Sequence, residues 1–255
     1  MRTPLMLTCL AFAALAAGAA DAACKLTASY DGAADAVGVT KVVVNTGPGD
    51  LSIVGRSDAQ RVVAKGSACA SSQPLFERLK LEVRREGDIV YVDAGIGNTD
   101  NVVTIGNSYA YINVGIAVPA QLPIEVRDSS GDTSVTGVER LDLTDSSGDI
   151  EVRDIGSAVI KDSSGDISVT GARGDVTVTF DGSGDITIRE VGGNVEIGSD
   201  GSGGIRVAGV KGNVTVGNDG SGSIDVSDVG GDFTVDSDGS GGISHRGVAG
   251  KVSIP

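Results

Sequence analysis

Aspartates that recur at fixed spacing are the residues of this sequence best suited to chemistry. Their spacing is 17 residues at first and 19 residues later. One column holds Asp145, Asp162, Asp181, Asp200, Asp219 and Asp238, and a second holds Asp132, Asp149, Asp166 and Asp185. Like charges stacked in this way repel one another unless solvent, hydroxyls, amides or a cation offset them. Calcium prefers such carboxylate oxygens and is therefore the candidate ligand.

Two interpretations of these aspartates stay open. In the first, calcium binds at the corners and stabilises the fold, and the candidate ligands are Asp145, Asp149, Asp162, Asp166, Asp181, Asp185, Asp200, Asp219 and Asp238. The corners are similar to the Gly-Gly-x-Gly-x-Asp turns of calcium-binding β-rolls. They depart from that motif because the second glycine-rich turn of each coil lacks its aspartate spacing. In the second interpretation, which we favour, the aspartates accept hydrogen bonds from turn amides and no cofactor is needed.

Three other side chains are candidates for binding. Tyr109 and Tyr111 alternate with apolar residues, so both rings are predicted to point outward and to suit a protein or sugar partner. His245 falls where earlier coils have Val or Ile, and it is either a metal ligand or a polar end to the repeat. The end effect is the favoured interpretation, because no second histidine is present.

Motifs of the common enzyme classes are missing from the sequence. It contains no Gly-x-Ser-x-Gly elbow, no phosphate-binding loop and no His-Glu-x-x-His pair. The acidic composition does not suit cleavage of acidic polysaccharides. A paired-carboxylate glycosidase stays open, since carboxylate separations cannot be obtained from sequence. We expect no enzymatic activity.

The repeat that positions the aspartates predicts the fold. Registering the coils on the Gly-Asp corners aligns five apolar columns, which begin at Thr133, Val135, Val138, Leu141 and Leu143. Polar residues alternate with the apolar ones, which is typical of short strands with one buried face. Stacked strands of this kind share a dry interior. The sequence therefore predicts an all-β fold, a single-stranded right-handed parallel β-helix with coils of 17–19 residues.

The segment before the repeat is also β-like but less regular. Strands are predicted at 41–45, 51–55, 61–65, 79–84, 89–93 and 109–118. We divide the chain into a signal peptide (1–22), an N-terminal β region that caps the solenoid (23–120) and the regular solenoid (121–255).

The N-terminus predicts export. An uncharged stretch, Leu5–Ala17, precedes Ala20 and Ala22, which stand where a signal peptidase cleaves. The stretch is too short to span a bilayer. Cys24 leaves a lipoprotein alternative open, but Asp21 stands where that motif has an aliphatic residue. We expect the protein in the periplasm, at the cell surface or secreted.

Cysteines and charge limit the remaining possibilities. Cys24 and Cys69 are left after removal of the signal, and export to an oxidising compartment predicts a disulfide between them. The net charge of −14 argues against nucleic acid and anionic membranes as partners. No apolar stretch after the signal is long enough to span a membrane.

The chain resembles the bacterial putative adhesin family of β-strand repeats, a domain of unknown function related to auto-transporter adhesin head domains. The resemblance rests on residues 39–44, 49–55 and 118–126 and on the Gly-Asp-Ile corners, and it covers residues 38–255. It implies a β-helix of the cell envelope and no catalytic residues.

The function we favour is a non-enzymatic envelope or secreted protein whose outer face is an adhesion or interaction surface for a protein or glycan. A calcium-stabilised solenoid and a polysaccharide-acting enzyme are the alternatives. The protein is expected to be a monomer or to associate weakly end to end.

Overall fold

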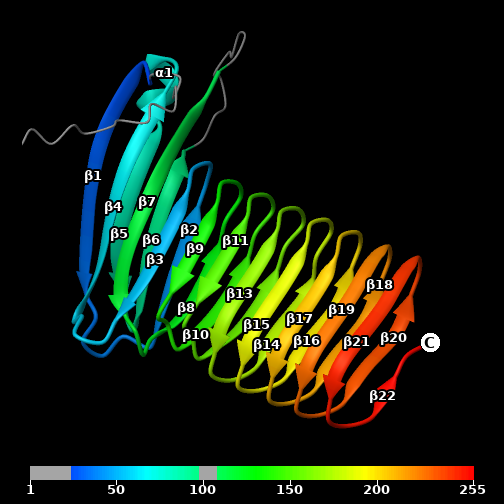
Figure 1. Cartoon of the computed structure of the whole chain (residues 1–255). Helices are drawn as coiled ribbons and strands as arrows, with labels where there is room; N and C mark the ends of the chain where they lie inside the picture. The colour runs from blue at the N-terminus through cyan, green and yellow to red at the C-terminus, as the bar shows by residue number, and fades with distance from the viewer. Residues whose placement is uncertain (1–23, 98–107) are drawn as a thin grey trace, which may run out of the picture.

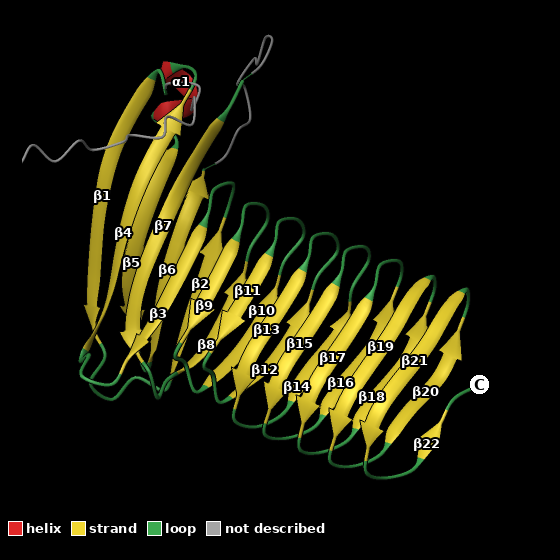
Figure 2. Ribbon diagram, viewed as in Figure 1, coloured by secondary structure: helices red, strands yellow, loops and turns green. Residues whose placement is uncertain are grey.

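The computed structural model describes residues 24–97 and 108–255, so the predicted signal peptide lies outside the described residues. The described chain is almost entirely β, with a single short helix, α1 (Gln73–Phe76). Its strands form two sheets of 11 strands each, which face one another along the whole molecule (Figures 1 and 2). No described helix is long and apolar enough to cross a membrane.

Each coil of the repeat contributes one strand to each sheet. The first sheet, sheet A, receives β9 (Thr133–Thr136), β11 (Ile150–Arg153), β13 (Ile167–Ala172), β15 (Ile186–Val191), β17 (Ile205–Val210), β19 (Gly222–Val229) and β21 (Gly241–Val248). The second, sheet B, receives β8 (Pro123–Arg127), β10 (Arg140–Thr144), β12 (Ser157–Lys161), β14 (Val176–Phe180), β16 (Val195–Asp200), β18 (Val214–Asp219), β20 (Phe233–Asp238) and β22 (Val252–Ser253). All of these neighbours pair in parallel.

The register of these strands confirms the predicted β-solenoid. Equivalent residues of successive coils pair directly, as Ile150 does with Ile167 and Ile186 does with Ile205. The apolar columns lie between the sheets and are buried through most of the repeat. β-Branched side chains suit this thin interior because they have few rotamers and stack on identical neighbours.

Glycine is required at one corner of every coil. Gly184 has a φ of +139°, and a Cβ added there would lie 1.9 Å from the carbonyl oxygen of Gly165 in the preceding coil. Successive coils therefore approach closely through their backbones at this corner, and only glycine permits the approach.

The N-terminal segment extends both sheets, but not in chain order. Its strands are β1 (Leu26–Asp35), β2 (Lys41–Thr46), β3 (Leu51–Arg56), β4 (Arg61–Ala70), β5 (Leu79–Glu86), β6 (Ile89–Ile96) and β7 (Ala110–Pro119). The coil β2–β3 lies between the coil β6–β7 and the coil β8–β9. The predicted strands are all present. Their spatial order was not predicted, because the spacing of a repeat does not show on which side of an earlier coil a later coil stacks.

Antiparallel strands close the N-terminal end of the solenoid. β4 pairs with β7 in sheet A, β5 pairs with β6 in sheet B, and β1 pairs with β4 at the edge of sheet A. β1 packs across the interior against β5, where the Tyr30 hydroxyl donates to the Leu79 carbonyl at 3.1 Å. The predicted disulfide is confirmed: Cys24 and Cys69 are bonded, with Cα atoms 5.6 Å apart. The division into domains stays a prediction.

Among the described residues, no antiparallel strand covers the C-terminal end of the solenoid. Ile243, Val248 and Val252 occupy core columns but are only partly buried, and Ile254 is 43% exposed. In Figure 1 the last coil lies at the end of the stack opposite the antiparallel strands.

Candidate functional site

The first aspartate column lies inside the solenoid. Asp145 is 1% exposed, and Asp162, Asp181, Asp200 and Asp219 are 0% exposed. Each stands at the end of a strand of sheet B or just after it, where the chain turns toward sheet A. Bulk solvent is therefore not what offsets the charge of these side chains.

Sequence reasoning missed the first member of this column. Asp128 precedes Asp145 by the 17-residue period and is 6% exposed. Its Oδ1 accepts hydrogen bonds from the Thr46 hydroxyl at 2.7 Å and from the Ser129 amide at 2.8 Å. Its Oδ2 accepts from the Thr133 hydroxyl at 3.1 Å. The period alone could have identified Asp128, because the repeat extends one coil further than the aspartates that were aligned.

The later members of the column have fewer donors. Oδ1 of Asp145 accepts from the Ser146 amide at 2.6 Å, and Oδ1 of Asp162 accepts from the Ser163 amide at 2.6 Å, but Oδ2 of each has no partner. In Asp181, Asp200 and Asp219 neither carboxyl oxygen accepts a well-aligned hydrogen bond, although amides of the following turn lie close enough to lower the pKa.

Burial raises the pKa values of these carboxyl groups. The pKa of Asp181 is raised to about 7, and the pKa values of Asp145 and Asp200 are raised to about 6. Burial also raises the pKa of Asp162 and of Asp219. Neighbouring aspartates act in the same direction as burial, while the amides of the following turn act against it.

The second aspartate column lies on the surface and forms hydrogen bonds between coils. Each Oδ1 accepts the backbone amide of the equivalent residue one coil further on. Asp132 accepts from Asp149, Asp149 from Asp166, Asp166 from Asp185, and Asp185 from Gly204, at 2.8–3.1 Å. Asp185 also pairs with Arg206 at 2.7 Å. These are the bonds to turn amides that the favoured interpretation of the sequence expects.

The structure extends this ladder to the N-terminal coils. Asn113 Oδ1 accepts the Asp50 amide at 2.9 Å, and Asp50 Oδ1 accepts the Asp132 amide at 3.3 Å. These partners are 63 and 82 residues apart in the chain. Among residues 24–97 and 108–255, no three acidic, histidine or cysteine side chains gather in a group that could hold a metal ion. Calcium binding stays an untested prediction.

A groove follows the outer face of β7 on sheet A. Three open hollows of about 460, 410 and 360 Å³ lie along this strand. The first two share Asp50 and Asn113, and the second and third share Ser52 and Gly115. The three hollows therefore adjoin one another along the strand, and together we call them the β7 groove.

Four outward residues of β7, two of them small, make the floor of the β7 groove. The outward positions of the strand are Tyr111, Asn113, Gly115 and Ala117. A Cβ added at Gly115 would meet no atom within 4 Å, so this position is open space. Four outward residues of a strand span about 20 Å, since a strand rises ~3.3 Å per residue.

The rims of the groove differ in chemistry along its length. Val63 of β4 and Val54 of β3 flank Ala117, and Val54 is 45% exposed. Lys65 and Arg56 line the same hollow as these valines. Asp50 lines the hollow at the other end and the middle hollow, and Asp132 lines the middle hollow. The groove thus has an apolar, basic end and an acidic end.

Tyr111 stands at the acidic end of the β7 groove. Its hydroxyl lies 3.6 Å from the Cys24 sulfur, so the disulfide supports the side chain. Tyr109 precedes the strand, and its backbone amide bonds the Ser71 hydroxyl at 3.0 Å. Both tyrosines are half-buried. The groove brings Tyr111 into a site, and partner contact by either tyrosine stays a prediction.

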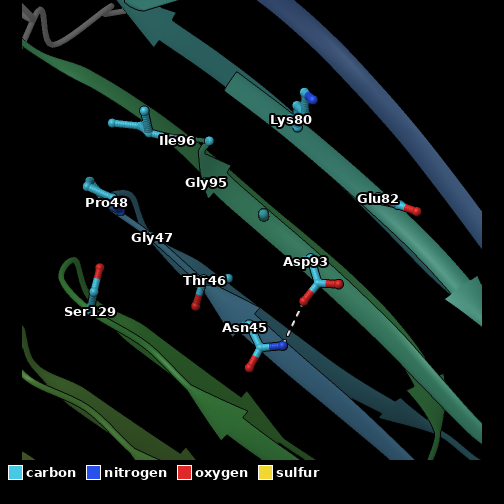
Figure 3. A pocket seen from close by; sticks show the side chains of 12 residues that line it. Asn45, Thr46, Gly47, Pro48, Lys80, Glu82, Asp93, Gly95, Ile96 and Ser129 are labelled. Carbon is cyan, nitrogen blue, oxygen red and sulfur yellow. Dashed lines mark hydrogen bonds between the residues drawn. The ribbon is translucent and has the colours of Figure 1, made fainter. Parts of the chain in front are cut away.

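A further hollow lies on sheet B (Figure 3). It is bordered by β2, β5 and β6, and its volume is about 550 Å³. Asn45 donates to Asp93 at 2.6 Å across its floor, and Arg84 pairs with Asp93 beside it. Asn45 and Asp93 are thus engaged with each other. We take the β7 groove as the candidate site because three adjoining hollows lie along one strand there.

His245 stands at the open end of the solenoid. It pairs in register with Val226, which places it in the second core column as the sequence predicts. The side chain is exposed, and its ring lies 6.1 Å from the ring of Phe233.

No protein-family model matches the chain, and a search of curated proteins found no match. Among solved structures, the chain is similar to a "putative adhesin" from Bacteroides fragilis, with 14% identity and a TM-score of 0.44 over 91% of this chain and 98% of that one. It is similar to a "putative cell adhesion protein" from Clostridium sporogenes, with 14% identity and a TM-score of 0.34 over 90% and 99% of the chains. A "putative lipid binding protein" from Parabacteroides distasonis has 14% identity and a TM-score of 0.36 over 89% and 97%.

These likenesses are too distant to assign a function to this chain. Membership of the putative adhesin family and the relation to auto-transporter head domains both stay predictions from the sequence.

Proposed function

We propose that this protein is a non-enzymatic interaction module that binds an extended segment of a partner protein in the β7 groove. The observation that carries this proposal is the open floor at Gly115 between two rims of unlike chemistry. The solenoid holds this floor rigid, because β7 is hydrogen-bonded to β4 on one side and to β3 on the other.

The groove suits a polypeptide in extended conformation. Its length of about 20 Å accommodates roughly six residues of a strand. Val54 and Val63 offer apolar contact for one side chain of such a segment, and Lys65 and Asp50 offer opposite charges on either side of it. Charges arranged in this way favour one direction of binding, since electrostatic complementarity sets the register of a complex.

The site can be closed without disturbing the fold. Gly115→Tyr places a ring in open space above the floor, where no atom would be displaced by the new Cβ. Gly242→Tyr is the matched control, because Gly242 is also a strand glycine of sheet A with open space above it but lies in the last coil. Peptides selected from a displayed library against the wild-type protein are the probe.

We expect Gly115→Tyr to weaken binding of the selected peptides by at least about tenfold, because the ring would occupy the centre of the site, where changes cost the most binding energy. Gly242→Tyr should bind as the wild type does. Equal binding by the Gly115 variant would refute the site. A glycan array screened in parallel tests the other partner class, and turnover of any glycan would contradict the non-enzymatic proposal.

We propose further that the protein is exported and resides in the cell envelope or outside the cell. The disulfide supports export, because disulfides form and persist in oxidising compartments. Cell fractionation with N-terminal sequencing checks this, and the expected mature N-terminus is Ala23.

A further inference from the structure

The buried aspartate column is a continuous stack along the interior. Asp181 pairs in register with Asp200, Asp200 with Asp219, and Asp219 with Asp238. Neighbouring strands of a sheet are ~4.8 Å apart, so the carboxyl groups repeat at about this distance. The pH dependence of these groups goes beyond the proposed binding function and rests on different residues.

The first coil of the stack differs from all later coils in one hydrogen-bond donor beside the aspartate. In the first coil the Thr133 hydroxyl donates to Oδ2 of Asp128. The residue equivalent to Thr133 is isoleucine in each later coil, as at Ile150 and Ile167. Oδ2 of Asp145 and of Asp162 has no partner. The later coils thus lack the hydroxyl donor that Thr133 supplies, although Oδ2 of their aspartates is buried.

A buried carboxyl oxygen without a donor is costly unless the group carries a proton. Repulsion adds to this cost, because two unit charges in a poorly screened interior interact strongly at this spacing. The charged groups that raise the pKa values of the stack are all aspartates. They are the neighbours within the stack, together with Asp149 acting on Asp162 and Asp185 acting on Asp200.

We propose that Asp145, Asp162, Asp181, Asp200 and Asp219 form a stacked chain of carboxyl groups that shares bound protons, so that the solenoid takes up protons as it folds. The O–H of one carboxyl donates to an oxygen of the carboxyl in the next coil. A spacing of ~4.8 Å between coils leaves room for an O–H···O bond of about 2.7 Å when the carboxyl groups lie along the stack. The proton replaces the donor that Thr133 supplies in the first coil.

The sign of the pH dependence follows from the direction of the pKa shifts. The folded-state pKa values lie above the ordinary value of 3.8, at about 6 for Asp145 and Asp200 and about 7 for Asp181. The folded state therefore binds more protons than the unfolded state between about pH 4 and pH 7. Stability from these groups is fully present below about pH 4 and is lost as pH rises through 6 to 7.

Thermal unfolding from pH 4 to pH 8 in EDTA at constant salt tests the proposal. We expect the Tm of the wild-type protein to fall by at least about 5 °C between pH 5 and pH 8. The double variant Asp181→Asn, Asp200→Asn carries neutral groups of the same shape whose amides donate as a protonated acid does. It should show a smaller fall. Asp166→Asn, on the surface column, is the matched control and should retain the wild-type dependence.

A second measurement does not depend on the variants folding. Infrared difference spectra of the wild-type protein at neutral pH should show the C=O band of protonated carboxyl groups, which disappears above pH 8. Absence of this band at pH 6, or a Tm that is constant from pH 5 to pH 8, would overturn the proposal. A Tm that rises only when millimolar calcium replaces EDTA would also overturn it and assign the stack to a cation.

Discussion

Thr133 shows how one residue changes the chemistry of a repeat. The column that contains it is otherwise isoleucine through six coils, so an apolar side chain is the usual occupant of this position. The hydroxyl is retained beside Asp128, where Thr46 supplies the other side-chain donor. The first aspartate of the stack is thereby satisfied by the protein alone, and the later ones are not.

We therefore predict that Thr133→Val lowers the free energy of unfolding by about 1–3 kcal/mol, because it leaves Oδ2 of Asp128 buried without a donor. Urea unfolding at pH 7 measures the change. Ser134→Ala, at the next and outward-facing position of the same strand, should change stability by less than about 0.5 kcal/mol. Equal effects of the two substitutions would contradict this account of Thr133.

At the scale of elements, the antiparallel strands behave differently from the coils. β1 lies at the edge of sheet A, and three of its five inward positions are the small residues Ala28, Gly32 and Ala34. Gly32 illustrates this, because a Cβ there would lie 2.5 Å from a methyl group of Val83. The disulfide from Cys24 to Cys69 ties the start of this edge strand to β4, in addition to the backbone pairing of the two strands.

We predict that reducing the disulfide loosens β1 and β4 without unfolding the coils. The bond closes a sequence separation of 45 residues, which is worth about 4 kcal/mol in the chain-entropy model. Hydrogen exchange should accelerate in β1 and β4, whereas β13 and β15 should be unchanged, because each coil contacts only its neighbours. Faster exchange throughout the solenoid would show that the end strands and the coils unfold together.

At the scale of the whole molecule, the two ends of the solenoid are unlike. Antiparallel strands cover the interior at one end, while β21 leaves a row of unpaired backbone groups at the other. Exposed strand edges invite pairing with a second chain, and polar residues that point inward oppose it. His245 is such a residue, since it occupies a core column in the last coil.

His245→Val should therefore promote end-to-end association. The substitution would join Ile243, Val248 and Val252 into an uninterrupted apolar layer beside the open edge of β21. Sedimentation velocity over a range of concentrations would detect the association, and Ser244→Ala on the outer face is the control. A variant that stays monomeric at every concentration would show that His245 does not protect this end.

Local pattern was sufficient to predict much of this protein. Alternation of apolar and polar residues at a fixed period identified the strands, their faces and the stacked coils. The disulfide followed from two cysteines and an export signal. These features depend on residues close in sequence or on the number of cysteines. The strand pattern is also repeated in every coil, so each coil supports the same prediction.

Tertiary structure alone decided where the candidate sites lie. The sequence predicted that the aspartates from Asp145 to Asp219 lie at the corners of the coils, but it did not predict that they point inward. Their direction is set by the path of the chain at the corner, because the alternation of inward and outward residues is interrupted where each strand ends. The β7 groove joins β3, β4, β7 and β9, whose order in the sheet differs from their order in the chain. The sequence by itself thus determined the repeating solenoid, because each coil needs its neighbours to bury an apolar face. The non-repeating coils, their order and the groove between them were decided by long-range pairing, which leaves no periodic trace in the sequence.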